Sequence, residues 1–216
     1  MARINSTKKG NRYSLIIFDM DGTLVQSEDC ASQALKDVMP GLLDTRDEVT
    51  ERYRGMRLAH IFEDIDSRYP GAVPHDCLDK YRVQEERLSS EHITACDGAA
   101  ELLSTLLTPM CIASNAPVEK TRRSLNITNL AKHFSSPIYS AYEVMAWKPD
   151  PALFLHAASE HKIDVESCLV IEDSDVGIQA GLAAGMDVIH YDPHEQGSNH
   201  SVQSIRSLIE LLEFAS

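Results

Sequence analysis

Four short apolar runs place the strongest limit on how this chain of 216 residues can fold. They lie at 14–18 (SLIIF), 110–113 (MCIA), 168–171 (CLVI) and 187–190 (DVIH). Each is continuous rather than alternating, which is typical of strands buried on both faces of a sheet. Helix-length segments follow or separate them at 98–107, 118–125, 151–161, 176–184 and 202–214. This alternation predicts an α/β fold with a Rossmann-like parallel sheet, whose ligands bind beyond the carboxyl ends of the strands.

The stretch 27–95 departs from this alternation. It contains no convincing apolar strand, but it has amphipathic helical segments at 30–38, 47–53, 58–69 and 77–88, separated by Pro-Gly and Gly turn signals. A block of helices directly after the first strand indicates an inserted all-α subdomain. We therefore expect a flexible tail over 1–12, an α/β core formed by 13–26 and 96–216, and a helical insert over 27–95.

Charge and cysteine content narrow the function classes. The net charge of −13 argues against broad electrostatic binding to nucleic acid or to an anionic membrane. No apolar stretch approaches the ~20 residues that span a bilayer, and the polar N-terminus does not resemble a signal peptide. The five cysteines include no C-x-x-C pair, which favours a reducing cytoplasm over a zinc site or a disulfide framework. An anionic substrate would need a local cluster of cations or a metal ion.

Two acids end the first strand, at Asp19 and Asp21, and Gly22 allows a sharp turn after them. Carboxylates this close repel one another, and a divalent cation or a retained proton relieves the repulsion. Either arrangement has a chemical use. An acidic loop or a plain Asp-Gly turn explains the same residues, so this motif alone leaves both interpretations open.

Polar residues also follow the later strands. Ser114 and Asn115 can bind an anion, although they equally suit a helix N-cap. Lys148 is followed by Pro149 and Pro151, which stiffen the segment; it can clamp a phosphate, or it is a surface lysine. Glu172 and Asp173 offer oxygen ligands that suit Mg²⁺, while Asp175 is better explained as the start of a helix. Together the four strand ends fit one site.

These motifs occur in the order found in the haloacid dehalogenase superfamily: DMDGT at 19–23, SNA at 114–116, KPDP at 148–151 and EDSDVGIQAGLAAGM at 172–186. Over roughly 13–214 the chain resembles phosphatases of the subfamily with a helical cap after the first motif, the β-phosphoglucomutase-like group. The runs TPMCIASN and WKPDPALFLHAA are most similar to bacterial sugar-phosphate phosphatases. This resemblance implies a small phosphorylated metabolite as substrate: a sugar phosphate or a phosphorylated sugar acid, for example 6-phosphogluconate.

The resemblance also implies a mechanism. Asp19 would attack phosphorus and form an aspartyl phosphate, and Asp21 would protonate the leaving oxygen and later activate water. Mg²⁺ would be held by the carboxylates of Asp19 and Asp173 and by the backbone carbonyl of Asp21. Glu172 would be an inner or an outer ligand.

In the same family pattern, Thr23, Ser114 and Lys148 would hold the phosphoryl oxygens, with backbone N–H groups near Gly22 and Asn115. The metal and the lysine would then supply the positive charge that the acidic chain lacks overall.

The insert would act as a cap that closes over the site, with hinges near 25–27 and 96–98. The loop Arg54-Gly55-Met56-Arg57 is the best candidate for facing the substrate. Arg54 or Arg57 could pair with a second anionic group, such as a sugar-acid carboxylate. Surface arginines at a helix junction are the alternative.

Three rival functions share parts of this pattern. Sugar phosphomutases carry every core motif, but they have a cap-linker histidine twelve residues beyond the nucleophile, where this chain has Ala31. Dehalogenases of the superfamily do not use Mg²⁺ and generally lack an acid at the position of Asp21. A non-catalytic phosphate-binding sensor would usually have lost a motif acid, whereas all are present here. We expect a cytoplasmic enzyme that is a monomer or a weak homodimer.

Overall fold

The computed structural model describes residues 12–214. Of the expected tail, residues 1–11 lie outside the described part. Arg12 lies inside it, and its guanidinium forms an ion pair with Asp187, 2.7 Å between Nη2 and Oδ2.

The core of the described chain is a six-stranded sheet in the order β5-β4-β1-β6-β7-β8, in which every neighbouring pair is parallel. The strands are β1 (Leu15–Phe18), β4 (Met110–Ser114), β5 (Ile138–Ser140), β6 (Cys168–Glu172), β7 (Asp187–Tyr191) and β8 (Gln203–Ile205). The four expected strands are present and form the middle of the sheet. The prediction of an α/β fold with a parallel sheet is confirmed.

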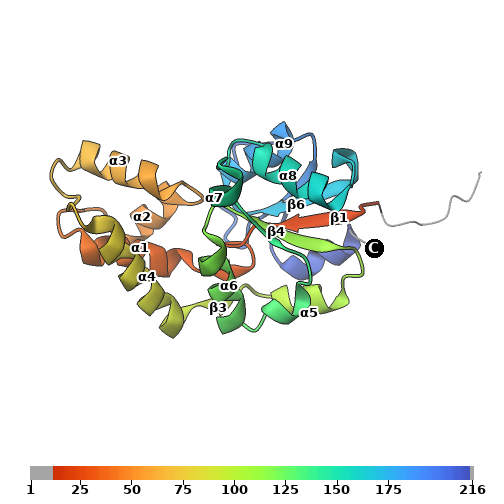
Figure 1. Cartoon of the computed structure of the whole chain (residues 1–216), viewed down its shortest axis with the longest axis horizontal. Coiled ribbons are helices and arrows are strands. Elements are labelled where there is room, and N and C mark those ends of the chain that lie inside the picture. Colours follow the sequence, from red (N-terminus) through yellow and green to blue (C-terminus); the bar gives the residue numbers. More distant parts are fainter. Residues whose placement is uncertain (1–11, 215–216) are drawn as a thin grey trace, which may run out of the picture.

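Helices cover both faces of this sheet (Figure 1). They are α5 (Ala99–Thr105), α6 (Val118–Ile127), α7 (Ala141–Val144), α8 (Ala152–His161) and α9 (Asp175–Ala183), together with the 3₁₀ turns η1 (Ala131–His133), η2 (Val165–Ser167) and η3 (Leu208–Glu213). The side chains of β1 alternate between the two layers. Leu15 and Ile17 pack with α8 and α9, whereas Ile16 and Phe18 pack with α5, α6 and η3. Each fully buried side chain of this size contributes about 1.5–3 kcal/mol, so β1 anchors the whole core.

Four further helices form a separate group beside the sheet (Figure 1). They are α1 (Glu28–Val38), α2 (Arg46–Tyr53), α3 (Leu58–Arg68) and α4 (Cys77–His92), and we refer to them as the cap. The cap has its own apolar centre, which includes Leu35, Val49, Ile65 and Tyr81. Its two connections to the core run side by side as an antiparallel pair, β2 (Val25–Gln26) with β3 (Thr94–Ala95). This pair was not expected from the sequence, because two-residue strands leave no periodic signal.

The segment 202–214 was expected to be a helix, and that prediction is wrong. Gln203–Ile205 pairs with β7 as the edge strand β8, and a 3₁₀ turn follows it. Ser207 and Glu210 form a capping box at the start of that turn. The apolar residues Leu208 and Leu211 are buried against the core, so a helix-like spacing is satisfied by a shorter turn.

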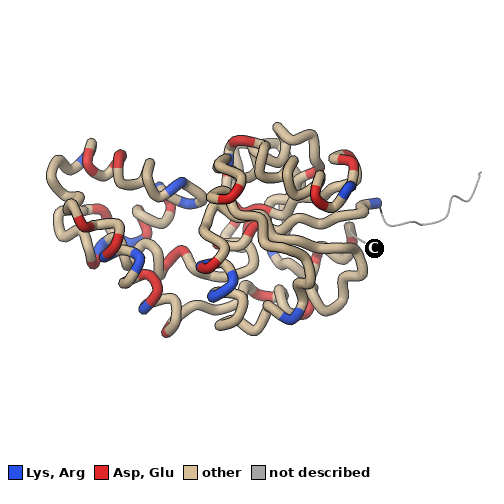
Figure 2. The backbone as a smooth tube through the Cα atoms, viewed as in Figure 1, with Lys and Arg blue, Asp and Glu red and all other residues tan. Residues whose placement is uncertain are grey.

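Acidic and basic residues occur in both the cap and the core, with acidic ones in excess (Figure 2). Among the described residues, none of the helices is both long enough and apolar enough to cross a bilayer.

Candidate active site

Three adjacent strands end at the same edge of the sheet. Because β1 lies between β4 and β6, the residues that end these strands converge: Asp19 follows β1, Ser114 ends β4 and Glu172 ends β6. All three are buried. These three residues, which the sequence places at strand ends, therefore lie close together in the structure.

Lys148 connects two of these acids. Its Nζ donates to Oδ1 of Asp19 and, at 2.6 Å, to Oε1 of Glu172. The lysine is only 5% exposed and its ammonium lies over the ring of Phe154, 4.9 Å from the centroid. Burial disfavours a charged lysine, but the two carboxylates outweigh it and raise the pKa of Lys148. The structure thus holds a cation at the sheet edge rather than at the surface.

The carboxylates of Asp19, Glu172 and Asp173 form a cluster in which one oxygen of each lies within 4.8 Å of the others. Burial raises the pKa of Asp19 to about 8, with Glu172 adding to the effect and Lys148 opposing it. Burial and neighbouring acids also raise the pKa of Asp173 well above its usual range. Three buried carboxylates with one lysine leave an excess of negative charge. Such a set of hard oxygen donors fits a divalent cation like Mg²⁺.

Two glycines make room for this cluster. Gly22 has φ +88°, and a Cβ there would lie 2.2 Å from Oδ2 of Asp173. A Cβ at Gly177 would lie 1.8 Å from Oε1 of Glu172. Glu172 is further fixed by Ser174, whose backbone N–H and hydroxyl donate to Oε2 at 3.0 and 2.9 Å. Ser174 is the N-cap of α9, which begins at Asp175, so the expectation that Asp175 starts a helix is confirmed.

Asp21 lies beside a different cation. Its Oδ1 accepts from the hydroxyl of Ser27 and from Nζ of Lys120 on α6, at 2.5 and 3.0 Å. Burial alone would raise the pKa of Asp21, but Lys120 and Ser27 outweigh it and lower this pKa. The two acids of the first motif therefore differ in environment: Asp19 is paired with Lys148, and Asp21 is paired with Lys120 and Ser27.

The predicted phosphate-binding residues are tied into the same edge. Thr23 donates to Oδ1 of Asp173 at 2.9 Å. Ser114 Oγ accepts from the N–H of Ala116 at 3.0 Å. Asn115 Oδ1 accepts from the N–H of Lys148 at 3.0 Å, and its Nδ2 donates to the carbonyl of Gly55 in the cap at 3.1 Å. Asn115 thus connects the backbone at Lys148 directly to the cap.

A cavity of about 670 Å³ lies between this edge and the cap. Its core wall includes Asp19, Asp21, Ser114 and Lys148, and its cap wall includes residues of α1, α2 and α4 and the loop 54–56. The size is within the range of small-molecule sites. The cap therefore covers the strand ends and encloses the space in front of them.

The two cap arginines singled out in the sequence lie in different places. Arg54 lines the cavity; its Nε lies 2.9 Å from Oε1 of Glu28, and its Nη1 donates to Oε1 of Gln196 at 2.6 Å. Arg57 is not among the described residues that line the cavity. Its guanidinium lies over the ring of Trp147, 3.8 Å from the centroid.

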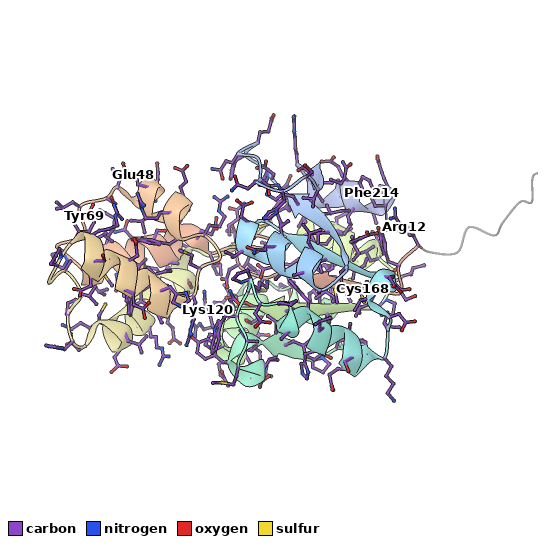
Figure 3. All side chains as sticks on the ribbon, turned by 90° about the horizontal axis from the view of Figure 1, so that it is seen from above. Arg12, Glu48, Tyr69, Lys120, Cys168 and Phe214 are labelled. Atoms are coloured by element: carbon purple, nitrogen blue, oxygen red, sulfur yellow. The ribbon has the colours of Figure 1, made fainter. Side chains whose placement is uncertain are left out.

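Lys120 and Glu85 are site residues that were not recognised in the sequence. Lys120 lies between the cap and the core (Figure 3). Its Nζ is 3.8 Å from Oε1 of Glu85, a buried acid on cap helix α4, and it also bonds to Asp21. Neither residue is part of a motif, although α6 begins directly after SNA at 114–116. Ion pairs between side chains of α4 and α6 bring the two residues together at the site.

Known proteins match this chain over most of its length. Residues 16–191 match the family described as haloacid dehalogenase-like hydrolase. The 6-phosphogluconate phosphatase of Escherichia coli strain K12 is 34% identical over 195 residues, which cover 88% of each chain.

Two crystal structures with 29% sequence identity share the fold. A conserved haloacid dehalogenase-like protein of unknown function from Agrobacterium tumefaciens C58 has a TM-score of 0.80 over 93% of this chain and 96% of its own. A haloacid dehalogenase (HAD) family hydrolase from Deinococcus radiodurans R1, with bound phosphate and sodium, has a TM-score of 0.75 over 94% of each chain. The chain belongs to the haloacid dehalogenase-like hydrolase family and is a phosphatase of that family.

Proposed function

We propose that this phosphatase requires Mg²⁺ and hydrolyses a small phosphorylated metabolite, a sugar phosphate or a phosphorylated sugar acid, through an aspartyl phosphate. The observation that carries the proposal is the placement of Asp19 in the buried carboxylate cluster beside Lys148, facing a cavity that the cap encloses. The similarity to a 6-phosphogluconate phosphatase supports 6-phosphogluconate as the first substrate to test.

Asp19 is the nucleophile in this proposal. Its carboxylate attacks phosphorus, the bond to the leaving oxygen breaks, and the covalent intermediate divides the hydrolysis into two easier steps. Asp19 and Asp173 would hold the metal with the backbone carbonyl of Asp21, and Glu172 would support them. When bound, Mg²⁺ supplies positive charge that balances the acids and the transferring phosphoryl group.

Asp21 is the acid and base. Ser27 and Lys120 both bind its Oδ1, which leaves Oδ2 as the atom that can carry a proton. In the first step Asp21 gives this proton to the leaving oxygen, and in the second it takes one from the attacking water.

Lys148 neutralises Asp19 in the resting site and binds a phosphoryl oxygen once substrate is present. Ser114 and the N–H groups around Asn115 bind the other oxygens. Thr23 holds Asp173 and adds a hydroxyl near the same oxygens. The cap excludes water other than the one that hydrolyses the intermediate.

Phosphate release from p-nitrophenyl phosphate and from 6-phosphogluconate, with Mg²⁺ and then with EDTA, tests the proposal. Asp19→Asn should abolish release while the circular dichroism spectrum and melting temperature stay those of a folded protein. Near wild-type turnover by that variant would refute the mechanism. Formation of glucose 6-phosphate from β-glucose 1-phosphate without free phosphate would instead identify a mutase.

A further inference from the structure

The cavity contains five basic side chains in its described walls, and four of them have acidic partners. Lys148 pairs with Asp19 and Glu172 on the core side of the cavity, which we call its floor. The other paired members are Arg54 with Glu28, Lys120 with Asp21 and Glu85, and Arg123 with Glu85 and Glu86. Each of these cations already balances a carboxylate of the protein, so a substrate group would have to displace one to use it.

Arg82 is the fifth. It lies on cap helix α4, is exposed, and lines the cavity beside Tyr81. Within residues 12–214 no carboxylate lies within ion-pair distance of its guanidinium. A charged guanidinium at the wall of the cavity, with all its donors available, is suited to binding an anion in the bidentate manner of arginine.

The acids one turn beyond Arg82 explain why it is left without an acidic partner. Glu85 is 4% exposed and accepts from Ser89 at 2.7 Å and from Arg123 at 3.3 Å. Glu86 lies 3.5 Å from Nη1 of Arg123. Both acids are therefore held by the core helix α6 or by their own helix. They lie three and four residues beyond Arg82 on α4, at the spacing of side chains that can pair along a helix.

We propose that Arg82 is a specificity-determining residue that binds a second anionic group, a carboxylate, at the end of the substrate remote from the phosphate. The inference rests on the proposed function. Lys148 and the carboxylate cluster lie on the core floor, whereas Arg82 lies on the cap wall of the same cavity. A substrate with a phosphate at one end and a carboxylate at the other would therefore span the floor and the cap. Arg82 would select phosphorylated sugar acids over sugar phosphates that lack a carboxylate.

Two substrates of equal length isolate this interaction. 6-Phosphogluconate and glucitol 6-phosphate share the six-carbon chain and the phosphate, and they differ in a carboxylate against a hydroxymethyl group. We expect the wild-type protein to have a higher kcat/KM for the acid. In Arg82→Gln the ratio of the two kcat/KM values should fall by at least about tenfold, mainly through KM for the acid. Arg82→Lys should keep part of the wild-type ratio. Lysine retains the positive charge but lacks the paired N–H donors with which a guanidinium binds both oxygens of a carboxylate.

Arg87→Gln is the matched control. Arg87 is an exposed arginine on the same helix that pairs with Glu91 and does not line the cavity. Its substitution should leave the ratio at the wild-type value.

The outcomes separate the inference from the function on which it rests. If the wild-type protein releases no phosphate from either sugar derivative or from p-nitrophenyl phosphate, the proposed function fails. If it turns over these esters but shows no preference for the acid, or if Arg82→Gln keeps the wild-type ratio, the role of Arg82 is refuted while the phosphatase proposal stands.

Discussion

Gly177 and Glu172 are packed so closely that a Cβ at position 177 would overlap the carboxylate of Glu172, with 1.8 Å to Oε1. Glu172 in turn accepts from Lys148, so a methyl group on α9 would push an acid that helps to hold the phosphate-site cation. We expect Gly177→Ala to lower kcat/KM by about 100-fold, the loss typical of an ångström-scale displacement at a reacting centre. It should also lower the free energy of unfolding by about 1–3 kcal/mol.

Gly181→Ala, on the same helix, separates the two effects. A Cβ there would meet the side chain of Val188 at 2.7 Å, which is an apolar contact away from the acids. This variant should lose stability in urea unfolding with much less loss of kcat/KM. Equal kinetic losses in the two variants would show that general strain in α9, and not displacement of Glu172, causes the defect.

Lys120 is expected to position the acid and base. Lys120→Met removes one of the two groups that hold Oδ1 of Asp21 and also removes a neighbour of Glu85. We predict that kcat falls by about 10- to 100-fold, within the contribution that positioned proton transfer makes. Steady-state kinetics with p-nitrophenyl phosphate measure this. Arg122→Met, an exposed residue on the same helix, is the control and should keep the wild-type kcat. A wild-type kcat in Lys120→Met would remove Lys120 from the mechanism.

Mg²⁺ should stabilise the folded protein, since an ion bound only by the native state raises the melting temperature with its concentration. The expected cause is relief of repulsion among Asp19, Glu172 and Asp173. Thermal shift with MgCl₂ should show a rise for the wild-type protein and none for Asp173→Asn.

The control for the metal experiment lies two residues further along. The carboxylate of Asp175 bonds to Ser198 and Asn199 and is outside the acidic cluster. Asp175→Asn should therefore keep the wild-type response to MgCl₂. A normal response in Asp173→Asn would contradict the proposed ligand.

Asp44 links stability to pH within the cap. It accepts two hydrogen bonds from Arg68, at 2.6 and 2.8 Å, and one from Tyr69 at 2.9 Å. The bonds from Arg68 lower the pKa of Asp44 below its ordinary value. The folded pKa is lower than the unfolded one, so the stabilisation is complete above about pH 4 and is lost as the pH falls through the folded value.

Asp44→Asn should therefore cost about 1–3 kcal/mol of unfolding free energy at pH 7. The difference from wild type should shrink as the pH falls below about 4. Urea unfolding of Asp44→Asn and of the wild-type protein, at pH 7 and at a pH below about 4, measures this difference in unfolding free energy. Asp47→Asn is the control, because that carboxylate is 89% exposed and should change stability little at either pH. A pH-independent difference for Asp44→Asn would mean that packing, and not ionisation, causes the loss.

The centre of the fold could be predicted because its strands are buried on both faces. Continuous apolar runs identify such strands, and parallel strands bring their carboxyl ends to one edge. This argument alone brings Asp19, Ser114 and Glu172 together. The edge strands β5 and β8 have only three residues each, which is too short for a comparable signal.

The cap side of the cavity could not be predicted in the same way. Arg82, Glu85 and Lys120 belong to helices with ordinary surface-like sequences, and they line one cavity only because the cap is placed over the core. Arg57 is the converse case, a residue that the sequence singled out for substrate binding but that is not among the described residues lining the cavity. Its position in a promising loop suggested substrate binding, whereas its guanidinium stacks on Trp147.

The stacked pair of Arg57 and Trp147 provides an intrinsic fluorescence probe of the position of the cap. Trp147 is the chain's only tryptophan and directly precedes Lys148, whereas Arg57 belongs to the loop between α2 and α3. Withdrawal of the cap would lift the guanidinium from the indole and hydrate it, which shifts tryptophan emission to longer wavelengths. If the cap opens and closes, stopped-flow fluorescence can time that motion in the native sequence, without an attached dye.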